Sequence, residues 1–254
     1  MVLFIQQTKI LITGNRLTMK KLLLILLCLP MVFTSCKKED NTLTNNTENN
    51  SMTYIPDNNF EQALIDLGHD SLLDGFVITA RIDTVTYLNV NNKQISDLTG
   101  IEKFISLTTL HCKINQFTTL DLTKNIELTM LDVSFNQLSS LNISENSALI
   151  YFACGETNIS TLDLSNNTAL TNLDVWETNL IELDLSNNSE LERVECNNNQ
   201  LTSVDLRNGN NTNLYMLTLD GNPNLTCINV DDADWSTSNW TNIDSQHYFS
   251  ETCP

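Results

Sequence analysis

The sequence is poor in basic residues, glycine, proline and aromatic side chains. Its 254 residues include 13 Lys and Arg against 31 Asp and Glu, a formal net charge of −18, with seven Gly, four Pro and 7% aromatics. So few basic residues exclude a general nucleic-acid-binding surface, which needs clustered Lys and Arg. The apolar fraction of 41% is enough to build a hydrophobic core, which argues against wholesale disorder.

No apolar run is long enough to cross a membrane, but a shorter one lies near the N-terminus. After Met19, two lysines precede the apolar stretch 22–33, and Thr34 and Ser35 lead to Cys36. A basic segment followed by an apolar run of about 12 residues is typical of a secretory signal peptide, whereas a membrane span needs ~20. We expect residues 1–35 to be a signal peptide, with residues 1–18 upstream of the true start if translation begins at Met19.

The end of this segment resembles a bacterial lipobox. Residues 32–36 read Val-Phe-Thr-Ser-Cys, and residues 37–40, Lys-Lys-Glu-Asp, are similar to the export signal of surface lipoproteins in Bacteroidetes-type bacteria. The resemblance implies cleavage before Cys36, lipid attachment to that residue and an outer-membrane protein that faces the cell exterior. Residues 36–52 are polar and nearly free of core residues, so we expect a lipidated flexible tether.

Apolar residues repeat at a nearly fixed interval over most of the remaining chain. The repeating segments start 21 to 23 residues apart, and apolar residues recur in them at offsets 0, 3, 5, 10, 13 and 15. Their first residues are Val85, Leu107, Leu128, Leu149, Leu170, Leu191 and Leu214. Such a period predicts a solenoid whose coils stack ~4.8 Å apart. We therefore expect seven coils over residues 85–230.

The repeated pattern, L-x-x-L-x-L-x-x-N-x-L, is that of a leucine-rich repeat. A second motif, L-x-x-L-D-L-x-x-N, is nested within it, which resembles the short 21-residue bacterial class. Residues 94–102 resemble the first coils of internalin-like repeats. The resemblance implies a β-solenoid with short parallel strands on both sides of each coil, and a role in adhesion or recognition at the cell surface.

Both ends of a solenoid need covers. Phe60, Leu64 and Leu67 lie on one helical face, which predicts a helical N-terminal cap over residues 53–84 and a first strand near 77–82. We expect Asn58 and Glu61 to form the capping pair of that helix, with Gly68 as its stop. Residues 231–254 break the repeat phase and should form the C-terminal cap.

Two asparagine columns recur with the repeat. We expect both to satisfy backbone groups at tight bends and to be part of the scaffold. One comprises Asn115, Asn136, Asn199 and Asn222, with Thr157 and Thr178 in the middle, and the other comprises Asn125, Asn146, Asn167 and Asn188.

The cysteines divide by position. Cys112, Cys154 and Cys196 share a core offset with two coils between neighbours, about 9.6 Å, which is too far for a disulfide. Cys227 and Cys253 both lie near the C-terminal end, and in an exported protein we expect them to form a disulfide that closes the cap, with two free thiols as the alternative.

No metal, cofactor or catalytic motif is apparent in the sequence. His69, His111 and His247 share no metal-ligand spacing, and no phosphate loop or nucleophile elbow occurs. An outward column of carboxylates recurs at offset 14, which we interpret as a solvated acidic face, with a calcium ladder as the alternative. Its acidic members are Asp121, Asp163, Asp184 and Asp205.

Exposed aromatic, methionine and arginine side chains on one strand face mark a candidate partner-binding surface, because such residues dominate protein interfaces. The candidates are Met130, Phe135, Tyr151, Trp176 and Arg193. We expect a non-enzymatic adhesion protein that binds a protein of a host or neighbouring cell, touches the membrane only through its lipid and does not bind nucleic acid. A glycan-binding protein and a structural spacer without a ligand are the alternatives, and isolated apolar side chains are common on any surface.

Overall fold

The computed structural model describes residues 51–254. The predicted signal peptide, the predicted lipidation site Cys36 and all but the last two residues of the predicted tether lie outside the described residues. Within residues 51–254, no helix combines the length and the apolar character that a membrane crossing requires.

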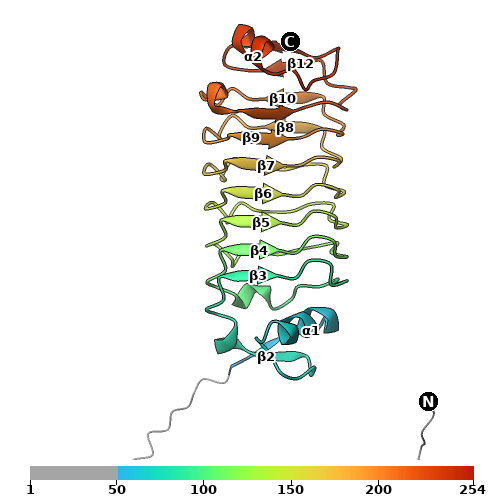
Figure 1. The fold of residues 1–254 in the computed structure, drawn as a ribbon, viewed down its shortest axis with the longest axis vertical. Coiled ribbons are helices and arrows are strands. Elements are labelled where there is room, and N and C mark those ends of the chain that lie inside the picture. The colour runs from blue at the N-terminus through green and yellow to red at the C-terminus, as the bar shows by residue number, and fades with distance from the viewer. Residues whose placement is uncertain (1–50) are drawn as a thin grey trace, which may run out of the picture. The chain divides into compact units, whose positions relative to one another are not determined.

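A parallel sheet of seven three-residue strands runs along one side of a solenoid (Figure 1). The register places Leu110, Leu131, Phe152, Leu173 and Val194 in one file, each paired with the next. The predicted leucine-rich-repeat solenoid is therefore confirmed. In spatial order the strands of this first sheet are β3 (Tyr87–Asn89), β4 (Thr109–His111), β5 (Met130–Asp132), β6 (Tyr151–Ala153), β7 (Asn172–Asp174), β9 (Arg193–Glu195) and β11 (Met216–Thr218).

The opposite side of the solenoid carries a second sheet of four parallel strands, which begins only in the C-terminal coils. Its strands are β8 (Glu182–Asp184), β10 (Ser203–Asp205), β12 (Cys227–Asn229) and β13 (Tyr248–Ser250). The corresponding stretches of earlier coils, such as residues 119–122 and 161–164, form no strands. The expectation of strands on both sides holds for the later coils, and shallow grooves lie between the earlier ones.

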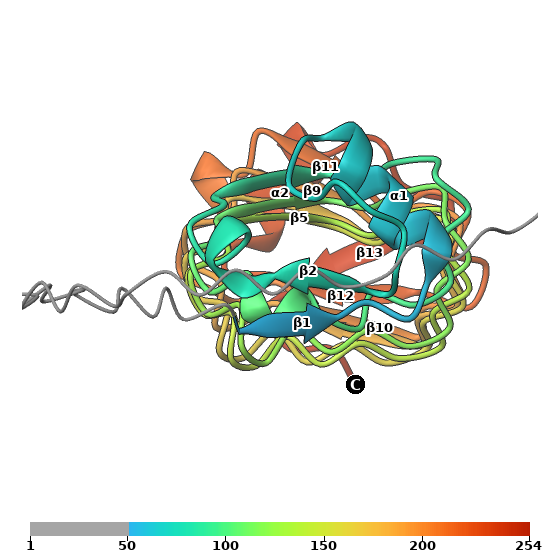
Figure 2. The ribbon, with the colours of Figure 1, turned by 90° about the horizontal axis from the view of Figure 1, so that it is seen from below.

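Figure 2 shows the two sides of the solenoid facing each other in a view along its length. The hydrophobic core lies between them. The repeated aliphatic side chains are buried, and they form one continuous hydrophobic cluster. Cys112, Cys154 and Cys196 are free and fully buried, and they alternate with Val133 and Val175 along one column, as predicted. Burial raises the pKa of all three thiols.

The asparagine columns join successive coils. Asn136 donates from Nδ2 to the carbonyl oxygens of Cys112 and Val133, at 3.1 and 2.8 Å, and its Oδ1 accepts from the N–H of Phe117 at 3.1 Å. Thr157, one coil later, donates to the carbonyl of Cys154 in its own coil. Each member of the second column is fully buried and donates to two carbonyls of the preceding coil. Both columns therefore serve the scaffold, as predicted.

The N-terminal cap consists of an antiparallel strand pair and a helix. Strand β1 (Met52–Tyr54) pairs with β2 (Phe76–Ile78), and helix α1 (Asn58–Asp66) lies between them in sequence. Strand β2 is shorter than the strand that we expected near 77–82, because the chain turns into a 3-10 helix directly after it. Residues 51–254 contain three 3-10 helices, η1 (Thr79–Arg81), η2 (Ile101–Lys103) and η3 (Asn211–Asn213).

The predicted capping pair of α1 is wrong by one residue. Asp57 has extended backbone angles and accepts hydrogen bonds from the N–H groups of Asn59 and Phe60, so it is the N-cap. Glu61 is fully buried and turns away from the cap to accept the N–H groups of residues 74–76. The helix ends where Gly68 takes a φ of 81°, as its role of stop requires.

The C-terminal cap contains helix α2 (Ala233–Asn239) and strand β13. The residues after α2 cover the end of the first sheet, because the Trp240 indole donates to the carbonyl of Leu214 and the Asn242 carbonyl accepts the N–H of Leu219. Cys227 and Cys253 form a disulfide with a Cα–Cα distance of 5.7 Å, which confirms the predicted pair.

Candidate interaction surface

The predicted partner-binding residues lie on the outward face of the first sheet or at its strand ends. Side chains alternate along each strand, so in β5 Leu131 points into the core while Met130 and Asp132 point outward. In the neighbouring strands Tyr151 and then Asn172 and Arg193 follow Met130 in register. Phe135 and Trp176 lie beyond the strand ends. Met130 is partly buried and belongs to no cluster, and the other four candidates form two pairs, Tyr151 with Arg193 and Phe135 with Trp176.

The first pair is engaged in a network of hydrogen bonds and ion pairs. The Tyr151 hydroxyl donates to Asp174 at 2.8 Å, and Arg193 donates to Asp174 at 2.7 Å and to Glu195 at 2.5 Å. On the N-terminal side, Lys113 lies 3.7 Å from a carboxylate oxygen of Asp132. These contacts cover the carboxylates, so Asp132 and Asp174 are only 8% and 7% exposed although they point outward.

The network shifts the pKa values of Tyr151 and Arg193. Burial, and then the hydrogen bond to Asp174, raise the pKa of Tyr151, so the phenol stays protonated and acts as a donor. Burial lowers the pKa of Arg193, but its bonds to Asp174 and Glu195 outweigh this and raise it overall. The centre of the face is therefore a closed polar layer, with Tyr151 and Arg193 half-buried in it.

The second pair, together with Ile114, forms an apolar rim, which we define as Ile114, Phe135 and Trp176; the first two are exposed and Trp176 is partly buried. The rings of Phe135 and Trp176 meet edge to face, 5.6 Å apart. Trp176 lies over Gly155, where a Cβ atom would come within 2.7 Å of the indole ring. Because Gly155 has no Cβ atom, the Trp176 indole can pack directly on its backbone.

Sequence reasoning missed Ile114 as a member of this rim. Ile114 and Phe135 occupy the same position in successive coils, just after the strand, and both have a φ of 57°. A left-handed conformation is costly for a β-branched residue. Both side chains are nonetheless largely exposed, at 46% and 42%. The repeat offset that placed Phe135 on this surface also places Ile114 there.

Two glutamates continue the rim column in the next coils. Glu156 and Glu177 follow Phe135 at the same offset, and both are exposed. Desolvation, and then a hydrogen bond and repulsion from Glu177, raise the pKa of Glu156. Unlike Asp132 and Asp174, these carboxylates have no ion-pair partner among residues 51–254, and Glu177 accepts a hydrogen bond of 3.4 Å from the Asn198 amide.

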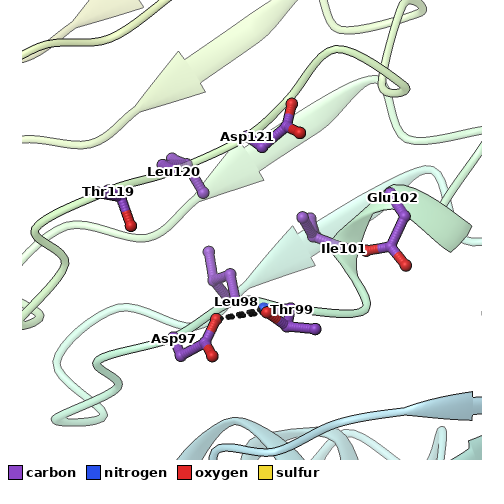
Figure 3. A pocket seen from close by; sticks show the side chains of 8 residues that line it. All are labelled: Asp97, Leu98, Thr99, Ile101, Glu102, Thr119, Leu120 and Asp121. Atoms are coloured by element: carbon purple, nitrogen blue, oxygen red, sulfur yellow. Dashed lines mark hydrogen bonds between the residues drawn. The ribbon is translucent and has the colours of Figure 1, made fainter.

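The acidic column on the other side of the solenoid has a local structural role. Asp121 accepts the N–H and hydroxyl of Thr123, and Asp163 accepts the N–H of Ser165, so each carboxylate holds a turn two residues on. These bonds lower the pKa of both aspartates. Figure 3 shows Asp97 in the same relation to Thr99, in a groove of about 330 Å³ that Asp121 also lines.

Within residues 51–254, no three potential metal ligands gather in one place. Asp184 and Asp205 of the offset-14 column are neighbours in register on β8 and β10. Each accepts the N–H of the residue two positions on, and Asp205 is also paired with Arg207. The calcium ladder, which we considered as an alternative, therefore has no cluster of ligands to support it.

Comparisons with known proteins point to the internalins. No protein-family model matches the chain. A stretch of 72 residues is 38% identical to Internalin J of Listeria monocytogenes serotype 4b (strain F2365), which is 28% of this chain and 8% of that protein. The solved structure of the internalin InlF from the same species aligns with a TM-score of 0.58 at 18% identity, over 78% of this chain and 71% of that chain. The chain therefore has the leucine-rich-repeat solenoid fold.

A second solved internalin, InlC2 of Listeria monocytogenes, supports the same fold. It aligns with a TM-score of 0.52 at 20% identity, over 75% of this chain and 95% of that chain. The match to Internalin J spans less than a tenth of that protein's length. The comparisons therefore establish the leucine-rich-repeat fold, and the partner of this chain has to be inferred from its own surface.

Proposed function

We propose that the chain is a non-enzymatic, lipid-anchored surface protein of the outer membrane that binds a protein of a host or neighbouring cell through the first-sheet face. The observation that carries this proposal is the apolar rim. Two of its three residues, Ile114 and Phe135, expose large side chains from left-handed backbone conformations, next to a face on which Tyr151, Asp174 and Arg193 are already paired with one another. Exposed aromatic groups beside a well-ordered polar layer are typical of protein interfaces.

The chemistry of the described residues favours binding over catalysis. The three free cysteines are buried with raised pKa values, so their thiols are neither accessible nor ionised. Tyr151 is held protonated, and its oxygen is committed to Asp174. The face thus offers shape, apolar area and charge to a partner.

The predicted lipid anchor supports the proposed location. The apolar segment 22–33, the lipobox-like residues 32–36 and the acidic export-like signal behind them are features of the sequence alone. Labelling of cells with a fatty-acid analogue tests the anchor directly. The wild-type chain should incorporate the label and Cys36→Ala should not, and equal labelling of both chains would refute lipidation at Cys36.

Capture experiments with matched variants test the binding face. The full chain is immobilised and offered to intact host cells, beside a double variant, Phe135→Ala with Trp176→Ala, and a control, Ile181→Ala. Ile181 is an equally exposed apolar residue (49%) that lies outside the first sheet, next to β8. We expect the double variant to lose at least about ten-fold in capture, since one or two aromatic anchors contribute ~2 kcal/mol or more, and the control to match wild type.

The same experiment distinguishes the alternatives. Equal capture by the double variant would refute the assignment of the face. Capture that survives protease treatment of the target cells but is lost after glycan removal would identify a glycan ligand instead. Equal thermal stability of the three chains is the condition for reading the result.

A further inference from the structure

The rim presents an aromatic surface that one partner side chain can lie against. Trp176 rests on Gly155 on one side and meets the edge of Phe135 on another, so its position is fixed by packing within the protein. The indole is only partly buried. A fixed, partly exposed indole beside a phenyl ring is a pre-formed contact surface. A partner that binds there does not lose affinity to the entropy cost of ordering these side chains.

The charged groups next to Phe135 and Trp176 in the rim column are carboxylates, and the cations of this face are paired elsewhere. Lys113 and Arg193 are engaged with Asp132, Asp174 and Glu195. Glu156 and Glu177 follow Phe135 in the same column, and Glu177 is the residue directly after Trp176. Neither carboxylate forms an ion pair with a cation of residues 51–254, although Glu177 accepts a hydrogen bond of 3.4 Å from the Asn198 amide. The whole chain is also strongly acidic, with a net charge of −18.

A partner side chain that fits this surface must contact both an aromatic ring and carboxylates that have no ion-pair partner. A guanidinium group stacks on an indole and donates in a plane to carboxylates. An apolar partner side chain would pack on the rings but would leave the carboxylates of Glu156 and Glu177 desolvated and without a counter-charge. An acidic partner side chain would be repelled by these carboxylates.

We infer that the apolar rim, with Glu156 and Glu177, receives an arginine side chain of the protein partner. This inference rests on the proposed function, because it names the chemistry of the partner at the same face. The guanidinium lies on Trp176 and donates to the two glutamates, and the partner surface around it is basic.

Nuclear magnetic resonance of the full chain tests this with a defined probe, the peptide Ac-Gly-Arg-Gly-Arg-Gly-NH₂. The indole N–H of Trp176 should shift on titration, while those of Trp235 and Trp240, in the C-terminal cap, report any general effect of a cation on an acidic protein. A Gly-Gln peptide of the same length is the neutral control. We expect Glu156→Gln with Glu177→Gln to weaken probe binding by about five-fold or more, as the loss of two exposed ion pairs implies.

A matched charge control separates the site from the overall charge. Glu127→Gln with Glu190→Gln removes two exposed carboxylates from the loops before β5 and β9 and should leave probe binding unchanged. Equal weakening by both double variants, or equal shifts with the Gln peptide, would overturn the inference. A Trp176 response to CaCl₂ alone that is abolished by Glu156→Gln with Glu177→Gln would assign the site to a divalent cation and would also overturn it.

The two proposals can fail separately. If the Phe135 and Trp176 variant loses capture of cells while the Glu156 and Glu177 variant keeps both capture and probe binding, the proposed function stands and the arginine site does not. If probe binding follows the predicted pattern but capture does not depend on the rim, the arginine site stands and the proposed binding face does not.

Discussion

Asn136 provides a quantitative test of how the coils are held together. It is 5% exposed, and replacing it with Ala leaves two groups without their partner, the Val133 carbonyl and the Phe117 N–H. The Cys112 carbonyl keeps a second donor, the amide of Asn115. At ~1–3 kcal/mol for each unpaired buried group, Asn136→Ala should cost ~2–6 kcal/mol.

A threonine at the same position should cost about half as much. Thr157 shows why, because its hydroxyl reaches the carbonyl of Cys154, the equivalent of Val133 one coil later, at 2.8 Å. Asn136→Thr would then leave only the Phe117 N–H unpaired, at ~1–3 kcal/mol. The exposed neighbour Gln137 serves as the control, since Gln137→Ala should stay within ~0.5 kcal/mol of wild type.

Equilibrium unfolding in urea measures these differences, provided that the slope of the transition is unchanged. We expect the order wild type, Gln137→Ala, Asn136→Thr, Asn136→Ala from most to least stable. If the alanine variant were within 0.5 kcal/mol of wild type, or if threonine cost as much as alanine, the asparagine column would not join the coils in the way that the hydrogen bonds indicate.

Three further predictions concern the cap, the rim and the acidic turns. Cys253→Ser removes the disulfide, which joins residues with a sequence separation of 26, and should lower the free energy of unfolding by ~3.5 kcal/mol in the chain-entropy model. Hydrogen exchange over residues 227–253 should become faster, and unchanged exchange there would contradict the prediction. Gly155→Ala should push the Trp176 ring away from Phe135 and shift the indole N–H resonance of Trp176 in nuclear magnetic resonance spectra. An unshifted resonance would show that Trp176 does not pack closely on Gly155. The pKa values of Asp121 and Asp163 are lowered in the folded chain, so both carboxylates stabilise the fold when the pH is above their ordinary pKa of 3.8. This stabilisation is lost as the pH falls below 3.8 and the carboxylates become protonated. A melting temperature that stays constant from pH 6 to pH 3 would contradict the prediction.

The repeat made most of the fold predictable. Six apolar offsets in phase over consecutive coils specify which side chains share the core, and the observed file of Leu131, Phe152 and Leu173 follows from that. The cap disulfide was predictable because Cys227 and Cys253 are near in sequence and outside the core column. Periodicity carries such long-range information because each coil meets only its neighbours.

The local contacts could not be read from periodicity. An offset gives the direction in which a side chain leaves the backbone, but not which neighbour reaches it, so Tyr151 and Arg193 were expected as exposed anchors although Asp174 holds both. The predicted N-cap, Asn58, was wrong for a similar reason. Periodicity did not indicate that Glu61 accepts hydrogen bonds from the N–H groups of residues 74–76 and therefore takes no part in the cap. The role of Gly155 depends on the orientation of a side chain one coil away.

Site-specific photo-crosslinking most directly tests the claim that the rim is the binding surface. A photoreactive amino acid is placed at Phe135 in one chain and at Ile181 in another, and each chain is illuminated on intact target cells. We predict that a protein adduct of one defined mass forms from position 135 and not from position 181. An adduct that forms from position 181 alone, or equally from both, would contradict the assignment.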